Sequence, residues 1–250
     1  MTDPVLFIPG ILCDARIFLP QIVQLGAKHA IQIAVPAQGE TIEQMSERIL
    51  ATAPAKFALV GHGLGGDIAL DILRRDMERV TRVALISTDP LAEAPSAAAA
   101  REARIVAAKS GRLKEAITQE YPAESFAQSP WRDEIMALMQ DMGLSLGEGV
   151  FMRQSRASQR RPDQQKTLRR AMLPALVIAG QLDPIAPVRR QDFTAALFPY
   201  GKLVTIADAG HLPMLEQPEA VTAALEEFLN GPLMLRQIRR TPVDRKSTRL

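Results

Sequence analysis

The sequence predicts an α/β fold, a doubly wound and mostly parallel sheet with a small helical cap inserted after its fourth strand. Two observations support this fold class. Short aliphatic and β-branched runs alternate with amphipathic stretches along most of the 250 residues, as in β-α-β units. The alternation stops between Asp89 and Leu173, where only helical patterns appear. A parallel sheet with one helical insertion accounts for both observations.

At least six segments have the length and composition of buried strands. Each is followed closely by a Gly, Pro, Ser or Asp, and they are residues 5–8, 31–35, 57–60, 82–86, 175–179 and 203–206. Such continuous apolar runs indicate strands that are covered on both faces. We expect the first strand to be central, the strand order to be 2-1-3-4-5-6, and the functional site to lie at the carboxyl ends of the strands.

Capping residues and apolar faces indicate the helices between these strands. Thr41 and Gln44 form a capping box, which predicts a helix that begins just after Thr41. Pro218 is suited to the first position of a helix. The segment that follows it has one apolar face, made of Val221, Leu225, Phe228 and Leu229.

We expect residues 1–89 and 174–230 to form the core and residues 90–173 to form the helical cap. Within the cap, the patterns predict helices near residues 97–108, 131–142 and 150–158. The large side chains of the cap are expected either to line a substrate pocket or merely to attach the cap to the core. These side chains are Phe126, Trp131, Met136, Met139, Phe151 and Met152.

The basic residues are concentrated at the C-terminal end. The chain has 30 Lys and Arg, 28 Asp and Glu, and a net charge of +2, but six basic residues and only Asp244 among the acidic ones lie in the last fifteen positions. The preceding residues carry 24 basic and 27 acidic side chains, so we expect no nucleic acid and no membrane as partner. The final residues 244–250 (DRKSTRL) match the translation of a common sequencing adapter. Residues 231–250 are therefore expected to be a disordered tail that is partly an artefact.

Composition excludes several classes of protein. With 47% hydrophobic and 23% charged residues, the chain is neither collagen-like, coiled-coil nor disordered. It has no apolar run of the roughly 18 to 20 residues that a membrane helix requires, and no signal peptide, so we expect a cytoplasmic location. Cys13 is the single cysteine, which excludes an internal disulfide. No phosphate loop with a Lys and no ligand cluster is present, so we expect no cofactor and no metal.

The segment 57–71 (FALVGHGLGGDIALD) has the pattern of a nucleophile elbow. An apolar strand runs into a glycine-rich turn and then into a helix. In such an elbow the central residue of Gly-x-Ser-x-Gly occupies a strained turn, and the flanking glycines allow strand and helix to approach closely. The flanking glycines here are Gly61 and Gly65, and the central residue is Gly63.

With this motif the chain resembles the α/β-hydrolase superfamily, in particular its short, capped, esterase-like and carbon–carbon hydrolase-like bacterial members. The resemblance covers about residues 4–230. Four motifs in the family's order support it: residues 8–11 (IPGI), 61–66 (GHGLGG), 180–184 (GQLDP) and 210–211 (GH).

The resemblance implies a catalytic role for two side chains and two backbone amides. Asp183 would be the acid and His211 the base of a triad, and the N–H groups of Ile11 and Leu64 would form the oxyanion hole. An imidazole activates a hydroxyl nucleophile only when a carboxylate holds it in the correct tautomer. The chain departs from the family at the nucleophile position, because Gly63 has no side chain, and at Pro9, where many relatives have His.

Four other residues have side chains that could take part in catalysis. Asp89, just after the fourth predicted strand, is the second choice for the acid. Cys13 lies near the oxyanion position and is either a substitute nucleophile or a small buried hydrophobic residue. His62 is expected to pack under the elbow, and His29 is expected at the surface.

The resemblance implies hydrolysis of a small carboxylic ester, thioester or related bond, with a small acyl or aromatic molecule as ligand. Gly63 leaves three alternatives open. The chain is an ordinary serine hydrolase with a substitution or sequencing error; or a His-Asp enzyme that works without an acyl intermediate, through water or proton abstraction; or a ligand-binding pseudoenzyme.

Overall fold

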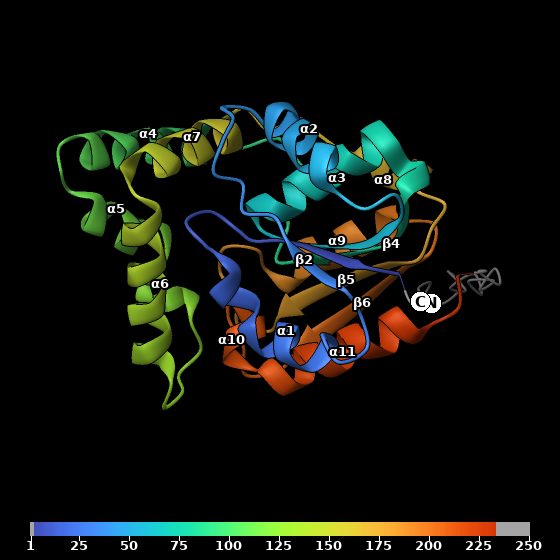
Figure 1. The fold of residues 1–250 in the computed structure, drawn as a ribbon. Coiled ribbons are helices and arrows are strands. Elements are labelled where there is room, and N and C mark those ends of the chain that lie inside the picture. The colour runs from blue at the N-terminus through green and yellow to red at the C-terminus, as the bar shows by residue number, and fades with distance from the viewer. Residues whose placement is uncertain (1–2, 234–250) are drawn as a thin grey trace, which may run out of the picture.

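The computed structural model describes residues 3–233 and confirms the predicted α/β fold (Figure 1). In this part of the chain, six strands form one sheet in the order β2-β1-β3-β4-β5-β6, and every neighbouring pair is parallel. The predicted strand order is therefore right. The strands are β1 (Val5–Ile8), β2 (Ile31–Ile33), β3 (Phe57–His62), β4 (Val80–Ile86), β5 (Ala175–Gly180) and β6 (Gly201–Ile206).

Strand β2 is shorter and strand β3 is longer than the sequence predicts. Strand β2 ends at Ile33, before the predicted end, although the N–H of Ala34 still donates to the carbonyl of Phe7 at 2.9 Å. Strand β3 continues through Gly61 and His62, which pair with Leu85 and Ile86 of β4. Because glycine was read as the end of the strand, the prediction stopped short of the site.

Helices cover both faces of the sheet (Figure 1). One face packs against α1 (Leu19–Leu25), which follows a short 3-10 helix (Ala15–Phe18), and against α10 (Pro213–Glu216) and α11 (Pro218–Asn230). The other face packs against α2 (Ile42–Thr52), α3 (Leu64–Asp76), α8 (Gln165–Arg170) and α9 (Val188–Leu197). A second 3-10 helix (Met77–Arg79) joins α3 to β4. The predicted starts near Thr41 and Pro218 correspond to α2 and α11.

The capping residues of α2 explain where this helix begins. The Thr41 hydroxyl accepts a hydrogen bond from the N–H of Gln44 at 3.2 Å. The side-chain oxygen of Gln44 accepts one from the N–H of Glu40 at 2.8 Å. Each bond provides a partner for a backbone donor at the helix start, where no intrahelical acceptor exists.

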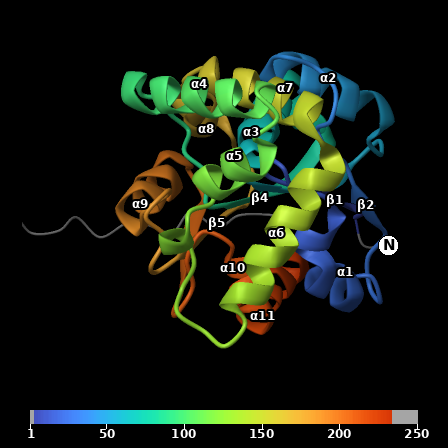
Figure 2. The same ribbon diagram turned by 90° about the vertical axis from the view of Figure 1, so that its left-hand side faces the viewer.

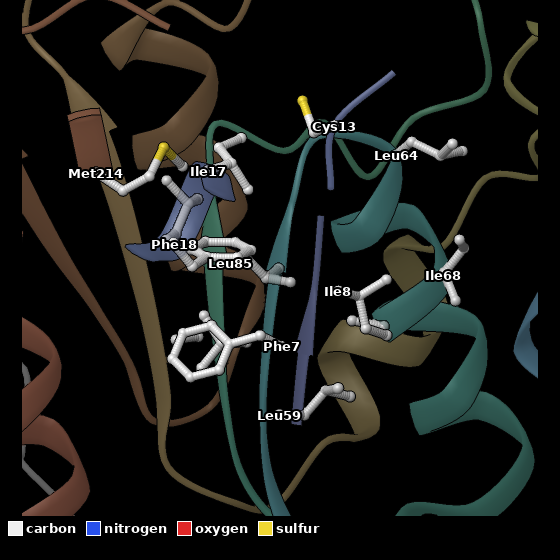
Figure 3. Packing of buried hydrophobic residues seen from close by; sticks show 14 of the residues in the cluster. Phe7, Ile8, Cys13, Ile17, Phe18, Leu59, Leu64, Ile68, Leu85 and Met214 are labelled. Atoms are coloured by element: carbon white, nitrogen blue, oxygen red, sulfur yellow. The ribbon is translucent and has the colours of Figure 1, made fainter. Parts of the chain in front are cut away.

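Strand β1 contributes side chains to both layers of the core, because successive residues of a strand point to opposite faces (Figure 3). Phe7 packs against Phe18, with the ring centroids 4.9 Å apart, on the side of α1 and α10. Ile8 points to the other face, toward Ile68 of α3. All residues of β1 are completely buried, as expected for a central strand.

The chain segment between β4 and β5 forms four helices that project beyond one end of the sheet (Figures 1 and 2). They are α4 (Pro95–Lys109), α5 (Leu113–Glu120), α6 (Arg132–Leu146) and α7 (Glu148–Gln159), with a third 3-10 helix (Ala123–Ser125) between α5 and α6. Helix α4 packs against α5 and α7, whereas α8 packs against the core helices α3 and α9. Helices α5 and α8 were not predicted. Of the predicted tail 231–250, residues 234–250 lie outside the described residues.

The first turn of α3 lies directly against two strands. A Cβ at Gly65 would lie 2.0 Å from the carbonyl oxygen of Ile8 in β1. A Cβ at Gly66 would lie 1.9 Å from the hydroxyl oxygen of Thr88, just after β4. Both distances are far below van der Waals contact, so only glycine allows the helix to begin here.

We therefore expect Gly65→Ala to lower the free energy of unfolding by about 3 kcal/mol, because the added methyl group forces strand and helix apart. The measurement is urea unfolding followed by circular dichroism. A matched control is Gly149→Ala in α7, where the nearest atom to the new Cβ is a flexible Arg153 nitrogen at 3.4 Å. That variant should be unchanged or more stable by up to about 1 kcal/mol. Equal stability of the two variants would contradict the close contact of α3 with β1.

Candidate active site

A cavity of about 520 Å³ lies between the carboxyl ends of the strands and the inserted helices. Residues that follow five different strands line it: Ile11, Gly63, Ser87, Ile185 and His211. Its remaining wall comes largely from α4, α5 and the loops next to them. The cavity therefore lies where a parallel sheet normally binds its ligand, and its volume suits a small molecule.

The structure brings Asp183 and His211 together. Nδ1 of His211 lies 2.9 Å from one carboxylate oxygen of Asp183, a hydrogen-bond distance, and both residues are buried. A carboxylate can only accept, so Nδ1 carries the proton and donates it to Asp183. The other ring nitrogen, Nε2, is left free to take a proton from a group in the cavity.

Backbone donors fix the Asp183 carboxylate. Its other oxygen accepts hydrogen bonds from the N–H groups of Ile185 and Ala186, at 2.8 and 2.9 Å. Burial alone would raise the pKa of Asp183, but His211 and the Ala186 N–H outweigh it and hold the pKa below the usual value. The carboxylate is thus in the ionised form that orients an imidazole.

The loop that carries His211 is held by a second buried carboxylate, which sequence reasoning missed. Glu216 accepts hydrogen bonds from the N–H groups of Gly210 and Leu212, each at 2.9 Å, and from that of Ala127 at 2.6 Å. The N–H of His211 donates to the carbonyl of Ser125 at 2.7 Å. The position of the imidazole therefore depends on the chain segment between α5 and α6 as well as on the core.

His62 lies beneath the elbow at the end of β3, as expected. Its Nε2 donates to the carbonyl of His211 at 3.1 Å, and the two rings are 5.1 Å apart. Burial, assisted by the charge of His211, lowers the pKa of His62 to about 3, so this ring is neutral. The expectation for His29 is wrong, because this residue is only 6% exposed and its Nδ1 lies 3.3 Å from the carbonyl of Asp3.

Gly63 occupies a turn at the start of α3 that would be strained for any other residue. Its φ is +50° and its ψ is −117°, a conformation that costs any other residue free energy. Its carbonyl accepts from the N–H groups of Gly66 and Asp67, and its N–H donates to Ile86, so the turn is fixed from both sides. No atom lies within 4 Å of the position that a Cβ would take. The turn therefore has space for a side chain and points into the cavity.

The amides of Ile11 and Leu64 border the same cavity. Among residues 3–233, neither amide has a hydrogen-bond acceptor. The Ile11 loop is fixed by its neighbours: the Tyr121 hydroxyl donates to the Ile11 carbonyl at 2.6 Å, and the Leu12 N–H donates to the Gln154 side chain at 2.8 Å. Two backbone donors without protein acceptors therefore border one cavity.

Of the two secondary candidates, Asp89 lines the same cavity but is not hydrogen-bonded to His211, and Cys13 does not line it. Cys13 is completely buried, with its Sγ 3.2 Å from the Ile11 carbonyl, and burial raises its pKa to about 12. Asp89 accepts from the N–H of Leu91 and lies 3.5 Å from Nε of Arg190, so it serves a turn and an ion pair. Cys13 is thus a buried thiol, and Asp183 takes the place beside His211.

The walls of the cavity are not formed by the Met and aromatic side chains of the insertion, which was one of the two alternatives for these residues. None of the six Met and aromatic side chains of the insertion lines it, because Phe151 is fully buried, Trp131 is 63% exposed, and Phe126 lies at a separate cavity of about 210 Å³. Instead the wall carries charged side chains: Asp67, Asp89, Glu93, Arg101, Arg104, Glu120, Arg161 and Arg190. The alternative that these Met and aromatic residues pack the inserted helices agrees better with the structure.

Two further cavity residues were missed. Ser87 follows β4 with φ +47° and lines the cavity, and its buried hydroxyl contributes to the low pKa of Asp183. Asp67 lies one helical turn after Gly63, and burial raises its pKa to about 7. Helical spacing from the elbow was a usable signal for Asp67, whereas nothing in the local sequence distinguishes Ser87.

Within residues 3–233, no helix is both long and apolar enough to cross a membrane. The same residues contain no group of three His, Cys, Asp or Glu side chains arranged to bind a metal ion.

The chain is similar to curated bacterial esterases. It is 26% identical to the pimeloyl-[acyl-carrier protein] methyl ester esterase of Aromatoleum aromaticum, over 78% of this chain and 83% of that protein. It is 25% identical to the protein of the same name from Edwardsiella ictaluri, over 87% of this chain and 90% of that protein.

Solved structures give a similar result. A thermophilic esterase from Thermogutta terrifontis, with malate bound, superposes with a TM-score of 0.77 at 27% identity, covering 90% of this chain and 89% of that one. The enol-lactonase of Burkholderia xenovorans shares the fold, with a TM-score of 0.82 at 21% identity, covering 92% and 93%.

One family model spans nearly the whole described core, from residue 5 to residue 224, and its description is the alpha/beta hydrolase family. The match includes the elbow, Asp183 and His211. The chain therefore belongs to the alpha/beta hydrolase family.

Proposed function

We propose that this protein is a hydrolase scaffold for small carboxylic esters or thioesters, with His211 as base, Asp183 as its orienting acid, and the amides of Ile11 and Leu64 as oxyanion hole. Gly63 takes the place of the nucleophile. The inserted helices α4–α7 act as a cap over the site. Similarity to ester hydrolases supports the reaction class, and the geometry of the cavity supports the roles.

One observation carries the proposal. The His211–Asp183 hydrogen bond of 2.9 Å lies beside a cavity that also contains Gly63, which has an elbow conformation and space for a side chain. A base, its orienting acid, a helix N-terminus and free amide donors at one cavity are the components of acyl transfer.

These components would act on an ester in the following way. Nε2 of His211 would take the proton of the attacking group, and Asp183 would stabilise the resulting imidazolium. The carbonyl oxygen would gain negative charge and lie against the two amides, at the positive end of α3. His211 would then give its proton to the leaving alcohol.

Gly63 removes one component of this scheme. Without a hydroxyl at the elbow, no acyl-enzyme forms at this position. Loss of the serine nucleophile costs about 10⁶-fold in kcat in a comparable triad, which corresponds to about 8 kcal/mol. The remaining groups can still give about 10³- to 10⁴-fold acceleration over water.

We expect Gly63→Ser to raise kcat for short p-nitrophenyl esters by up to about 10⁶-fold over the unmodified chain, because base, acid and oxyanion donors are already in place. In the Gly63→Ser protein, His211→Ala should remove almost all of the gain. The absorbance of released p-nitrophenolate at 405 nm measures the rates of both proteins.

The matched control for this pair is His29→Gln, which removes a buried histidine next to Asp3, away from the cavity-lining residues. It should leave the rate of the Gly63→Ser protein unchanged. A Gly63→Ser protein that folds but hydrolyses none of the short p-nitrophenyl esters would refute the proposed nucleophile position.

A second variant tests the acid. In the Gly63→Ser protein, Asp183→Asn should lower kcat by about 10⁴-fold with little change in KM, because the amide favours the wrong imidazole tautomer. Asp89→Asn should lower kcat by less than tenfold, since Asp89 pairs with Arg190 and not with His211. Steady-state kinetics of both variants decides the assignment, and the reverse order of effects would make Asp89 the acid.

One observation favours a second candidate, a direct attack by water. The free space at Gly63 can hold a water molecule within reach of the Leu64 amide, and His211 is oriented to act as a general base. This mechanism requires that the unmodified chain hydrolyses esters without a pre-steady-state burst and that His211→Ala abolishes the activity. Activity that survives His211→Ala would exclude it.

A further inference from the structure

Three arginines converge on the cavity from two inserted segments. Arg101 and Arg104 lie one turn apart on α4, and Arg161 follows α7. Their side chains are only 11%, 15% and 18% exposed. Guanidinium groups are almost never buried without partners, so the charge balance of this cluster is informative.

Two glutamates pair with these arginines but do not use all of their donors. Arg101 donates to Glu93 at 3.2 Å and to Glu120 at 2.8 Å. Nε of Arg104 lies 2.8 Å from Glu120, and one terminal nitrogen of Arg161 lies 2.7 Å from Glu93. Within residues 3–233, neither terminal nitrogen of Arg104 and only Nε of Arg161 takes part in a hydrogen bond with good geometry. Strong donors are therefore available to a ligand in the cavity.

The carboxyl groups of the cluster differ in how well they balance the positive charges of the three arginines. Three guanidinium groups face the carboxylates of Glu93 and Glu120, and the third carboxyl group, Asp67, lies 3.7 Å from Arg161. Burial raises the pKa of Asp67 to about 7, so this carboxyl group is a weaker counter-charge than a carboxylate with an ordinary pKa. Arg101 and Arg104, in contrast, hold the pKa of Glu120 low even though burial alone would raise it. A bound carboxylate would add a second acceptor for the Arg104 and Arg161 side chains.

The cluster lies near the reacting groups. Glu120 precedes Tyr121, whose hydroxyl binds the Ile11 carbonyl and whose ring centroid is 6.1 Å from that of His211. The same cavity is lined by Gly63 and by Arg104. A ligand of a few carbons can therefore contact the elbow with one end and the arginines with the other.

We propose that the cavity selects esters whose acyl part ends in a second carboxylate, and that Arg104, with Arg161, binds this carboxylate. A guanidinium group offers two parallel donors that match the two oxygens of a carboxylate. The substrate class is thus the half-esters of short dicarboxylic acids. This inference rests on the proposed function, because it assumes that the ester group lies at Gly63.

The test uses two esters that differ only at the far end of the acyl chain, mono-p-nitrophenyl glutarate and p-nitrophenyl pentanoate. In the Gly63→Ser protein, kcat/KM should be higher for the glutarate. Arg104→Gln should lower the ratio of the two kcat/KM values by about 10- to 100-fold, which is the usual effect of losing a hydrogen bond to a charged group. The control Arg112→Gln removes an arginine that pairs with Glu115 on the surface of α5, and it should leave the ratio unchanged.

A second variant, which is expected to raise the glutarate preference, distinguishes carboxylate binding by the arginines from a purely structural role of these residues. Glu120→Gln removes the carboxylate that competes for Arg101 and Arg104, so the glutarate preference should rise. If the arginines only attach α4 to α5, both Arg104→Gln and Glu120→Gln should impair hydrolysis of the two esters equally. That outcome would overturn the inference.

Failure of the inference and failure of the proposed function give different results. Hydrolysis of both esters without preference for glutarate would refute the carboxylate site and leave the function intact. If neither ester is hydrolysed, titration calorimetry of the unmodified chain with glutarate and with pentanoate decides the question. Binding of glutarate that is lost in Arg104→Gln supports the site, and equal binding of both acids refutes it.

Discussion

The backbone contact between the first turn of α3 and the end of β1 determines where the other parts of the site lie. At Gly65 there is no space for even a methyl group between the helix and the Ile8 carbonyl. The turn at Gly63 is therefore directed out of the sheet edge, the first amides of α3 face the cavity, and the Ile11 loop lies beside them. A looser contact would separate the two amides that are proposed to stabilise an oxyanion.

A second constraint is the cost of burying charge next to this edge. Asp183 and Glu216 are buried, the Glu120 side chain is only 8% exposed, and each carboxylate has backbone or arginine partners. Such pairing is required because an unpaired buried charge costs several kcal/mol. Arg104 and Arg161 differ from these carboxylates, since they make ion pairs but use few of their N–H donors in hydrogen bonds, and this difference motivates the ligand-binding role proposed for them.

The sequence predicted the sheet well because burial on both faces requires continuous apolar strands. Strand order, the elbow, and the positions of Asp183 and His211 after β5 and β6 could all be predicted from motifs and alternation. The lining of the cavity could not, because it depends on how α4 and α5 pack over the sheet edge. Arg104 lies in an alanine-rich helix whose pattern does not show which face meets the cavity, and the sequence left open whether the Met and aromatic residues line the pocket or pack the inserted helices.

Backbone strain gives the last argument about Gly63. Among residues 3–233, the non-glycine residues with positive φ are Leu12, Ser87 and Asp208. Each is close to the site: Leu12 follows an oxyanion amide, Ser87 lines the cavity, and Asp208 precedes the His211 loop. Each costs on the order of 1 kcal/mol or more, and such costs concentrate at functional sites. Gly63 also has a positive φ but pays no such cost, because glycine has no Cβ. Strain at three positions around one cavity, which folding stability alone does not favour, is consistent with the ligand-binding role proposed for it.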